Sequence, residues 1–187
     1  MENQITLLKA MRGDRQAFEH LITPYEQMVW RVCWQLMGNR YDAEDAAQIT
    51  MIKAWKAVPQ YRGDSAFSTW VYQIAVHTCM DELRKRDRIR PETQLFSETG
   101  NSSTDHLTPE SEVIVQESCS EIRKALDQLD EDQKIPIVLY AIEEKTYDEI
   151  SETLGIPSGT VKSRISRGRE CLRRILGFKN SGKGAGK

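Results

Sequence analysis

Residues 155–176, GIPSGTVKSRISRGRECLRRIL, join a short turn that contains glycine to a strongly basic stretch. Apolar residues recur there at intervals of three and four, which predicts a helix over 159–176. At about 100° per residue, one stripe collects the side chains expected to pack, which are Val161, Ile165, Gly168, Leu172, Ile175 and Leu176. The opposite side carries Lys162, Ser163, Ser166, Arg167 and Arg174, with Arg164 and Arg169 on the flanks, where they could meet phosphates. Such a helix either reads DNA or is an ordinary amphipathic helix with a solvated or protein-binding face.

The residues before this helix favour DNA binding. A short helix is expected at 147–154, where TYDE at 146–149 matches a capping box with Thr146 as N-cap and Glu149 reaching back. Gly155 is well placed to end that helix in a left-handed conformation, and Ser158 to cap the next one. A short helix, a tight turn and a longer basic helix are the layout of a helix-turn-helix. Serines between long basic side chains suit a major groove, where Arg pairs with guanine and Ser with several bases.

The charges are segregated along the chain. Its 187 residues carry a formal net charge of only -2 and are 39% hydrophobic, enough for one compact domain or two small ones. Residues 158–187 hold nine Lys or Arg against one acid, Glu170, and RKRDRIR at 84–90 is a second basic run. Two basic stretches, separated by an acidic one, suggest two places for a polyanion.

Composition and spacing exclude several classes of protein. No apolar run approaches a membrane span and the N-terminus lacks a secretory layout, so we expect a cytoplasmic protein without membrane insertion. The four cysteines lie far apart, which indicates buried free thiols rather than disulfides or a zinc site. There is no Gly-rich phosphate loop and no visible nucleophile–base pair, so we expect no catalysis, no cofactor and no metal.

The composition changes at about residue 91, where PETQLFSETGNSSTDHLTPES lacks helical or strand periodicity. We predict an all-α fold of two small helical domains, 1–90 and 110–177, joined by a flexible acidic linker over 91–109 and followed by a disordered tail over 178–187. The other predicted helices are 3–12, 15–37 with a break near Pro24, 42–57, 65–86, 110–128 and 131–142. The predicted N-caps are Asp42, Asp64 or Ser65, and Asp130.

Two N-terminal helices carry faces of interest. Helix 42–57 has a polar edge that is either solvated or a docking surface, formed by Asp45, Gln48, Lys53 and Lys56. Helix 65–86 has two apolar stripes, so it is sandwiched or bound. A third stripe between them contains Trp70, Gln73, His77, Asp81 and Arg84 and leads into Arg86, Arg88 and Arg90. Aromatic and basic groups together suit unstacked single-stranded bases, although core packing is an equal alternative for Trp70.

Four stretches carry a resemblance to a known family: DAEDAAQ, YRGDSAFSTWVYQIAVHTCMDELRKR, the acidic linker and YDEISETLGIPSGTVKSRISRGRE. In this order and spacing they resemble the extracytoplasmic-function (ECF) sigma factors of bacterial RNA polymerase, in the sigma-70 family, from about residue 5 to 176. The resemblance implies that 1–90 is region 2, which docks on the β′ clamp helices of core RNA polymerase and melts the downstream (−10) promoter element. Residues 110–177 would be region 4, which binds the upstream (−35) element, with the β flap as a further polymerase contact.

The resemblance also implies roles for particular residues. Asp45 and Gln48 match the positions by which the family grips polymerase, so their edge becomes the predicted polymerase-binding surface. The loop that would capture a base flipped from the non-template strand is Tyr61, Arg62, Gly63, Asp64, Ser65, Ala66 and Phe67. His77 stands where family members commonly have Asn, so we expect it to affect the choice of base. An anti-sigma factor, which a membrane anchor could hold, is the implied inhibitor.

We therefore predict a sigma factor that confers promoter choice on core polymerase. One rival is a conventional repressor or activator with an N-terminal sensing domain, which would bind duplex DNA tightly without polymerase. The other is an adaptor that binds only proteins, which would show no salt-dependent affinity for nucleic acid.

Overall fold

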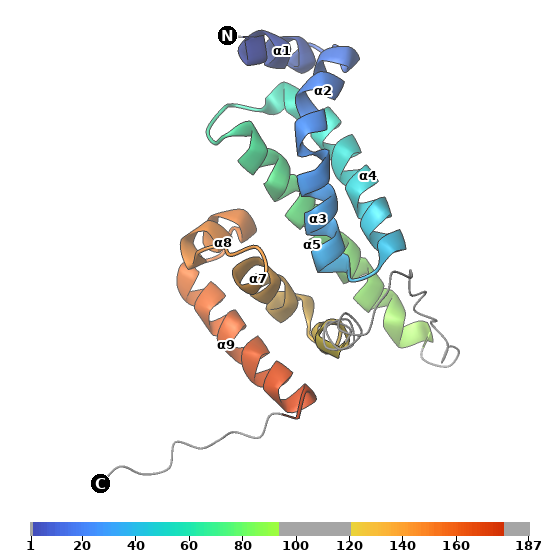
Figure 1. Cartoon of the computed structure of the whole chain (residues 1–187), viewed down its shortest axis with the longest axis vertical. Coiled ribbons are helices and arrows are strands. Elements are labelled where there is room, and N and C mark those ends of the chain that lie inside the picture. The colour runs from blue at the N-terminus through green and yellow to red at the C-terminus, as the bar shows by residue number, and fades with distance from the viewer. Residues whose placement is uncertain (1, 94–120, 178–187) are drawn as a thin grey trace, which may run out of the picture. The chain divides into compact units, whose positions relative to one another are not determined.

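The computed structural model describes residues 2–93 and 121–177, with side chains over 4–86 and 121–177. These residues are helical, with no strand among them, and form two compact units, one in the N-terminal half reaching Arg88 and one in the C-terminal half (Figure 1). The all-α prediction is confirmed. The tail over 178–187, most of the linker and the start of the helix predicted at 110–128 lie outside the described residues, so the domain boundaries stay predictions.

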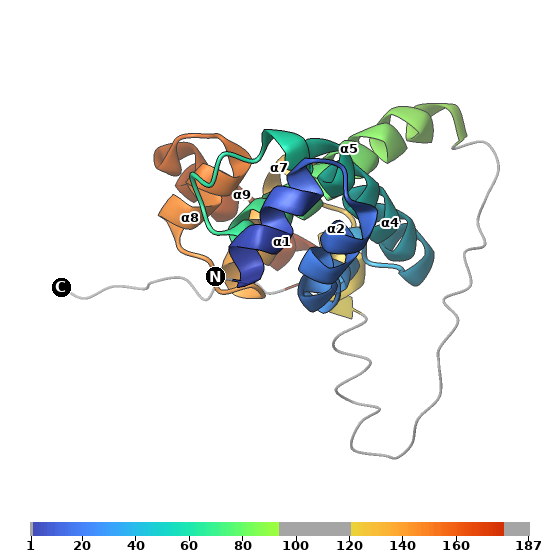
Figure 2. The same cartoon turned by 90° about the horizontal axis from the view of Figure 1, so that it is seen from above.

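The N-terminal unit contains α1 (Glu2–Met11), α2 (Arg15–Ile22), α3 (Glu26–Met37), α4 (Arg40–Ala57) and α5 (Phe67–Thr93), with short 3-10 turns at Thr23–Tyr25 and Val58–Gln60. The break predicted near Pro24 is confirmed by the first of these turns. Helix α1 packs on α2 (Figures 1 and 2), and α3 packs on α4 (Figure 1). Small buried residues on α4, among them Ala43, Ala46 and Ala54, face this core and permit the close approach of α3.

The N-caps of α4 and α5 and the C-terminal end of α5 differ from prediction. Helix α4 begins at Arg40 and is capped by Asn39, whose side chain accepts a hydrogen bond from the Asp42 N–H at 2.9 Å. Helix α5 begins at Phe67, and its Trp70 N–H donates to the Ala66 carbonyl at 3.0 Å, so neither Asp64 nor Ser65 is the N-cap. The same helix continues to Thr93, past the composition change at residue 91, because the Lys and Arg of the preceding basic run are good helix formers.

The C-terminal unit is helical over 121–126 and continues with α7 (Glu131–Ala141), α8 (Tyr147–Leu154) and α9 (Ser158–Ile175). Helix α7 packs on α9, and the core between the helices includes Ile135, Val138, Leu139, Ile150, Val161 and Ile165. Asp130 occupies the predicted N-cap position of α7, but its carbonyl rather than its side chain accepts the first N–H groups, from Gln133 and Lys134 at 2.9 Å.

The turn between α8 and α9 follows the predicted helix-turn-helix layout. The capping box is confirmed: the Thr146 N–H donates to Glu149 Oε2 at 2.8 Å, and the Glu149 N–H donates to Thr146 Oγ1 at 3.2 Å. Gly155 is left-handed, with φ of 64°, as predicted. Ser158, however, is the first residue of α9 and not its cap; the Pro157 carbonyl accepts from Thr160 at 2.8 Å and from Val161 at 3.1 Å.

Candidate nucleic-acid and polymerase interfaces

Helix α9 presents a packed stripe and an opposite polar face. Val161, Ile165 and Gly168 are buried, while Leu172, Ile175 and Leu176 are half-buried. On the other side Lys162, Ser166, Arg167 and Arg174 are exposed. Ser163 is half-buried, and its hydroxyl donates to the Thr160 carbonyl at 2.9 Å. The predicted segregation of packing and basic residues is therefore present in the structure.

Both flanking arginines of α9 contact residues of α7 that the sequence analysis did not single out. An Arg164 Nη2–Asp132 Oδ2 ion pair measures 2.8 Å. The Arg169 guanidinium lies 4.9 Å from the centroid of the Tyr140 ring, and that ring stacks on Tyr147 at 5.1 Å. Helix α7 thus engages both of the cations that could meet phosphates, one through an acid and one through an aromatic ring. Local spacing could not have revealed this, since Asp132 lies 32 residues from Arg164.

The loop before α5 is held by aromatic packing. The Tyr61 hydroxyl donates to the Ser65 carbonyl at 2.6 Å, and the Tyr61 ring packs against Phe67 at 5.5 Å and Trp70 at 5.2 Å (ring centroids). Burial, together with Asp64 and Tyr25, raises the pKa of Tyr61. Trp70 is half-buried in this cluster, so it packs and at the same time borders the loop. The loop residues Arg62, Gly63, Asp64 and Ala66 are exposed.

Helix α5 has two largely buried stripes and one stripe with exposed residues. Both apolar stripes are largely buried, including Val71, Tyr72, Val76, Thr78 and Leu83. On the third stripe His77, Asp81 and Arg84 are exposed and Gln73 is half-buried. Arg86 Nη1 lies 3.9 Å from Asp42 Oδ2 of α4, so it is not a free cation of the basic track. The side chains of Arg88 and Arg90 lie outside the described residues.

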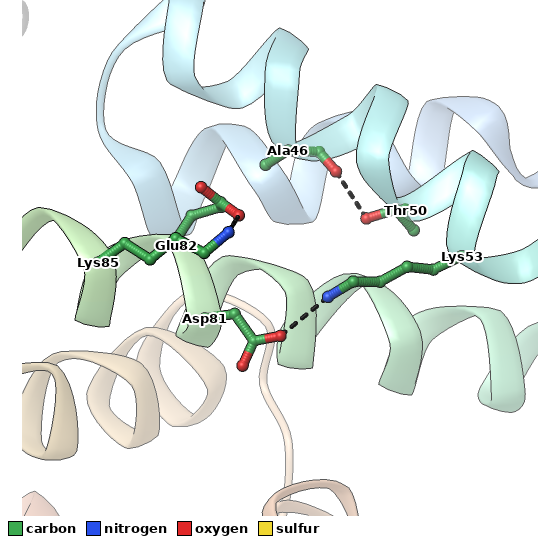
Figure 3. A network of polar contacts seen from close by, with 6 residues as sticks. All are labelled: Ala46, Thr50, Lys53, Asp81, Glu82 and Lys85. Carbon is green, nitrogen blue, oxygen red and sulfur yellow. Dashed lines mark hydrogen bonds and ion pairs between the residues drawn. The ribbon is translucent and has the colours of Figure 1, made fainter.

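Helix α4 has an exposed face of mixed character. Asp45, Gln48 and Lys56 are exposed, and they share the face with Tyr41 and Ile52, which are 79% and 54% exposed. Sequence reasoning missed the two apolar residues, although positions 41, 45, 48, 52 and 56 recur at helical spacing. Lys53 lies apart from them. Its side chain extends toward α5, where Nζ lies 2.8 Å from Asp81 Oδ2 (Figure 3).

The described cysteines are free thiols. Cys33 and Cys79 are buried, as predicted, whereas Cys171 is half-buried. A hydrogen bond with Cys79 lowers the pKa of the Cys33 thiol against the opposing effect of burial. Cys119 lies outside the described residues. Within residues 2–93 and 121–177, no set of three His, Cys, Asp or Glu side chains could hold a metal ion. No helix in those ranges is long and apolar enough to span a membrane.

Comparisons with known proteins agree with this arrangement. The Sigma-70 region 2 model matches residues 21–89, and the Sigma-70 region 4 model matches residues 119–172. The chain is 34% identical over 174 residues to the ECF RNA polymerase sigma factor SigW of Bacillus subtilis, covering 88% of this chain and 91% of that one. It is 32% identical over 181 residues to the RNA polymerase sigma-H factor of Pseudomonas aeruginosa, covering 94% of each chain.

Two solved structures share the fold. The sigma factor RpoE from Bartonella quintana, in complex with the anti-sigma factor NepR, aligns with a TM-score of 0.63 at 24% identity, covering 87% of this chain and 98% of that one. CnrH, in complex with the cytosolic domain of CnrY, aligns with a TM-score of 0.61 at 20% identity, covering 96% of this chain and 100% of that one. At these identities the likeness concerns the fold.

Fold, helix-turn-helix and family matches define a sigma-70 type specificity factor of RNA polymerase. Within that class, the chain belongs to the extracytoplasmic-function sigma factors, as the sequence analysis predicted. Its function is promoter-specific initiation of transcription with core RNA polymerase.

Proposed function

We propose how the residues of this sigma factor divide the work of initiation. The polar face of α9 reads the upstream element, the exposed face of α4 docks on the β′ clamp helices, and the loop 61–67 with the third stripe of α5 opens the downstream element. The C-terminal unit also contacts the β flap. We assign the protein no catalytic step of its own, and we place it in the cytoplasm because core polymerase works there.

One observation carries the assignment of α9. Lys162, Ser166 and Arg167 are exposed opposite the buried Val161 and Ile165, on the second helix of a helix-turn-helix. In that motif the second helix enters the major groove, and its exposed N-terminal side chains meet base edges. Arg167 is exposed, with its Nη2 3.5 Å from Ser163 Oγ, and its guanidinium can pair with guanine. Arg164 and Arg169 on the flanks suit phosphates.

The experiment is a binding profile of holoenzyme on duplexes that carry every single-base change in the upstream element. Arg167→Ala should cost about 1–3 kcal/mol and relax the preference at one position. Arg174→Ala is the matched control: it removes an exposed arginine from the last turn of the same helix. We expect this control to leave the profile's shape unchanged. An unaltered profile for Arg167→Ala would remove Arg167 from base reading.

We further propose that an anti-sigma factor restrains this protein. The RpoE structure, which shares this fold, was determined with the anti-sigma factor NepR, and this motivates the proposal. The exposed faces of α4 and α9 are the surfaces that such a partner would have to cover to block docking and promoter reading. Loss of core binding when the partner is added, followed by recovery when it is removed, is the expected result.

A further inference from the structure

Lys53 and Asp81 form an ion pair that joins α4 to α5. The Lys53 Nζ and Asp81 Oδ2 atoms lie 2.8 Å apart, and the side chains are 41% and 51% exposed. Figure 3 shows Lys53 extending from α4 toward α5 to reach the carboxylate. At about 100° per residue, Lys53 lies roughly 80° around α4 from Asp45 and about 140° from Gln48. Its charge is therefore directed away from the face that we assign to polymerase docking.

Asp81 occupies an unfavourable position for an acid. It belongs to the stripe Trp70, Gln73, His77, Asp81 and Arg84, which we assign to the exposed DNA strand, and it is the one acid among these five residues. The repulsion between a carboxylate and a phosphate about 7 Å apart in water has an energy of about RT. This energy corresponds to about a threefold loss of binding affinity. An uncompensated Asp81 would therefore weaken the strand contact.

Two neighbouring cations of α5 pair with other acids. Lys85 Nζ lies 2.6 Å from Glu82 Oε1, and Arg86 pairs with Asp42 of α4 at 3.9 Å. Lys53 Nζ donates a hydrogen bond to Asp81 Oδ2 at 2.8 Å, so it places a positive charge directly on this carboxylate. Exposed ion pairs add little to folding stability, so a purely structural reason for this one is weak.

We propose that Lys53 belongs functionally to the strand-binding surface, where it neutralises Asp81, and not to the polymerase-docking face of α4. The inference rests on the role proposed above for the α5 stripe. Lys53 acts through Asp81 and is a positioning residue: it masks a negative charge along the path of the phosphates. Removing Lys53 exposes that charge, and removing both partners restores a stripe without repulsion.

The test uses holoenzyme and promoter DNA identified by run-off transcription, prepared as a fork whose non-template strand is unpaired over the downstream element. Lys53→Met should weaken binding to this fork about threefold to tenfold at low salt, and the loss should shrink as salt rises. Lys53→Arg keeps the positive charge and should bind like wild type. The double variant Lys53→Met with Asp81→Asn should return to within about twofold of wild type. Core-polymerase affinity of Lys53→Met should equal that of wild type.

Four outcomes would overturn the proposal. In the first, holoenzyme with Lys53→Met binds the fork like wild type, which would show that Lys53 does not affect strand binding. In the second, Lys53→Met loses affinity for core polymerase, which would assign Lys53 to the docking face. The double variant could retain the full loss, which would show that Asp81 is not the cause. Wild-type holoenzyme could show no preference for the fork over the closed duplex, which would remove the proposed role of the α5 stripe as well. Only this last outcome would also contradict the proposed function of the α5 stripe; the other three would leave it intact.

Discussion

Gly168 is the position where one added carbon should disturb the placement of the reading helix. It lies in the middle of α9 on the buried stripe. A Cβ there would overlap Cδ1 of Ile137 and lie 3.1 Å from Cβ of Gln133, both on α7. Ile137 is itself buried, so its side chain has little room to move.

Two effects of Gly168→Ala oppose each other. In a helix interior, alanine stabilises the folded state by about 1 kcal/mol relative to glycine, because of its higher helix propensity. Overpacking of a buried contact typically costs about 1–3 kcal/mol, and a direct overlap with a buried side chain belongs in the upper part of that range. The expected net result is a loss of about 1–2 kcal/mol from the C-terminal unit. Gly159→Ala is the matched control, since nothing lies within 4 Å of a Cβ at that position of the same helix.

Hydrogen exchange followed by mass spectrometry on the full chain measures this loss. Amides of α7 and α9 should exchange about 5–30 times faster in Gly168→Ala, while those of α3 in the N-terminal unit stay unchanged. Ile137→Val deletes the overlapping Cδ1 atom, so it should restore part of the protection in the double variant. If Gly168→Ala is as protected as Gly159→Ala, or if Ile137→Val only adds to the loss, the steric reasoning is wrong.

Three further predictions concern DNA reading and the helix-turn-helix. We expect His77→Asn to change the preference at one downstream base without abolishing activity, because either side chain can hydrogen-bond a base edge. Transcription from templates that carry each of the four bases at every downstream position measures this preference. An unchanged base preference would show that His77 does not take part in base recognition. Hydrogen bonds from Thr146 lower the pKa of Glu149, so the stability that this carboxylate adds is present above its usual value of 4.5 and is lost as pH falls through the lower folded value. Thr146→Ala keeps the backbone N–H but removes the hydroxyl, so it should weaken this acid dependence of stability in part. Urea titrations across the acid range measure it, and the same dependence in both proteins would refute the prediction. Asp132→Asn removes the acid that pairs with Arg164, which frees the guanidinium for phosphates. The affinity of the protein for non-specific duplex DNA should therefore rise about twofold to fivefold at low salt. Unchanged or weaker affinity in salt titrations would show that Asp132 does not compete with phosphates for Arg164.

The sequence correctly predicted several features that depend on residues within one or two helical turns. The capping box of Thr146 and Glu149, the left-handed Gly155 and the packed stripe of α9 all follow from such local rules. The cap of α4 was missed because Asp42 and Asn39 are equally good caps by residue type. Gly38 ends α3 in a left-handed conformation, with φ of 81°, and Asn39 follows it in an extended conformation, as an N-cap requires. The end of α3 therefore determines which residue caps α4.

Contacts between helices were beyond the reach of periodicity. A helical projection says that Lys53 and Arg164 are polar and near the surface, but it does not say whether they are solvated or paired. Their partners lie 28 and 32 residues away in sequence, on helices whose packing decides the pairing. The same reason explains the half-burial of Trp70, which depends on the Tyr61 and Phe67 rings folding back over it.

Run-off transcription with purified core RNA polymerase on a library of genomic fragments tests the central claim most directly. Wild-type protein should produce transcripts that start at a discrete set of promoters sharing an upstream and a downstream element. The double variant Asp45→Arg with Gln48→Ala should keep its helicity but fail to co-purify with core enzyme and yield none of these transcripts, whereas the exposed control Gln27→Arg on α3 should behave like wild type. Tight duplex binding without polymerase, combined with no promoter-specific transcripts from the wild-type protein, would contradict the account.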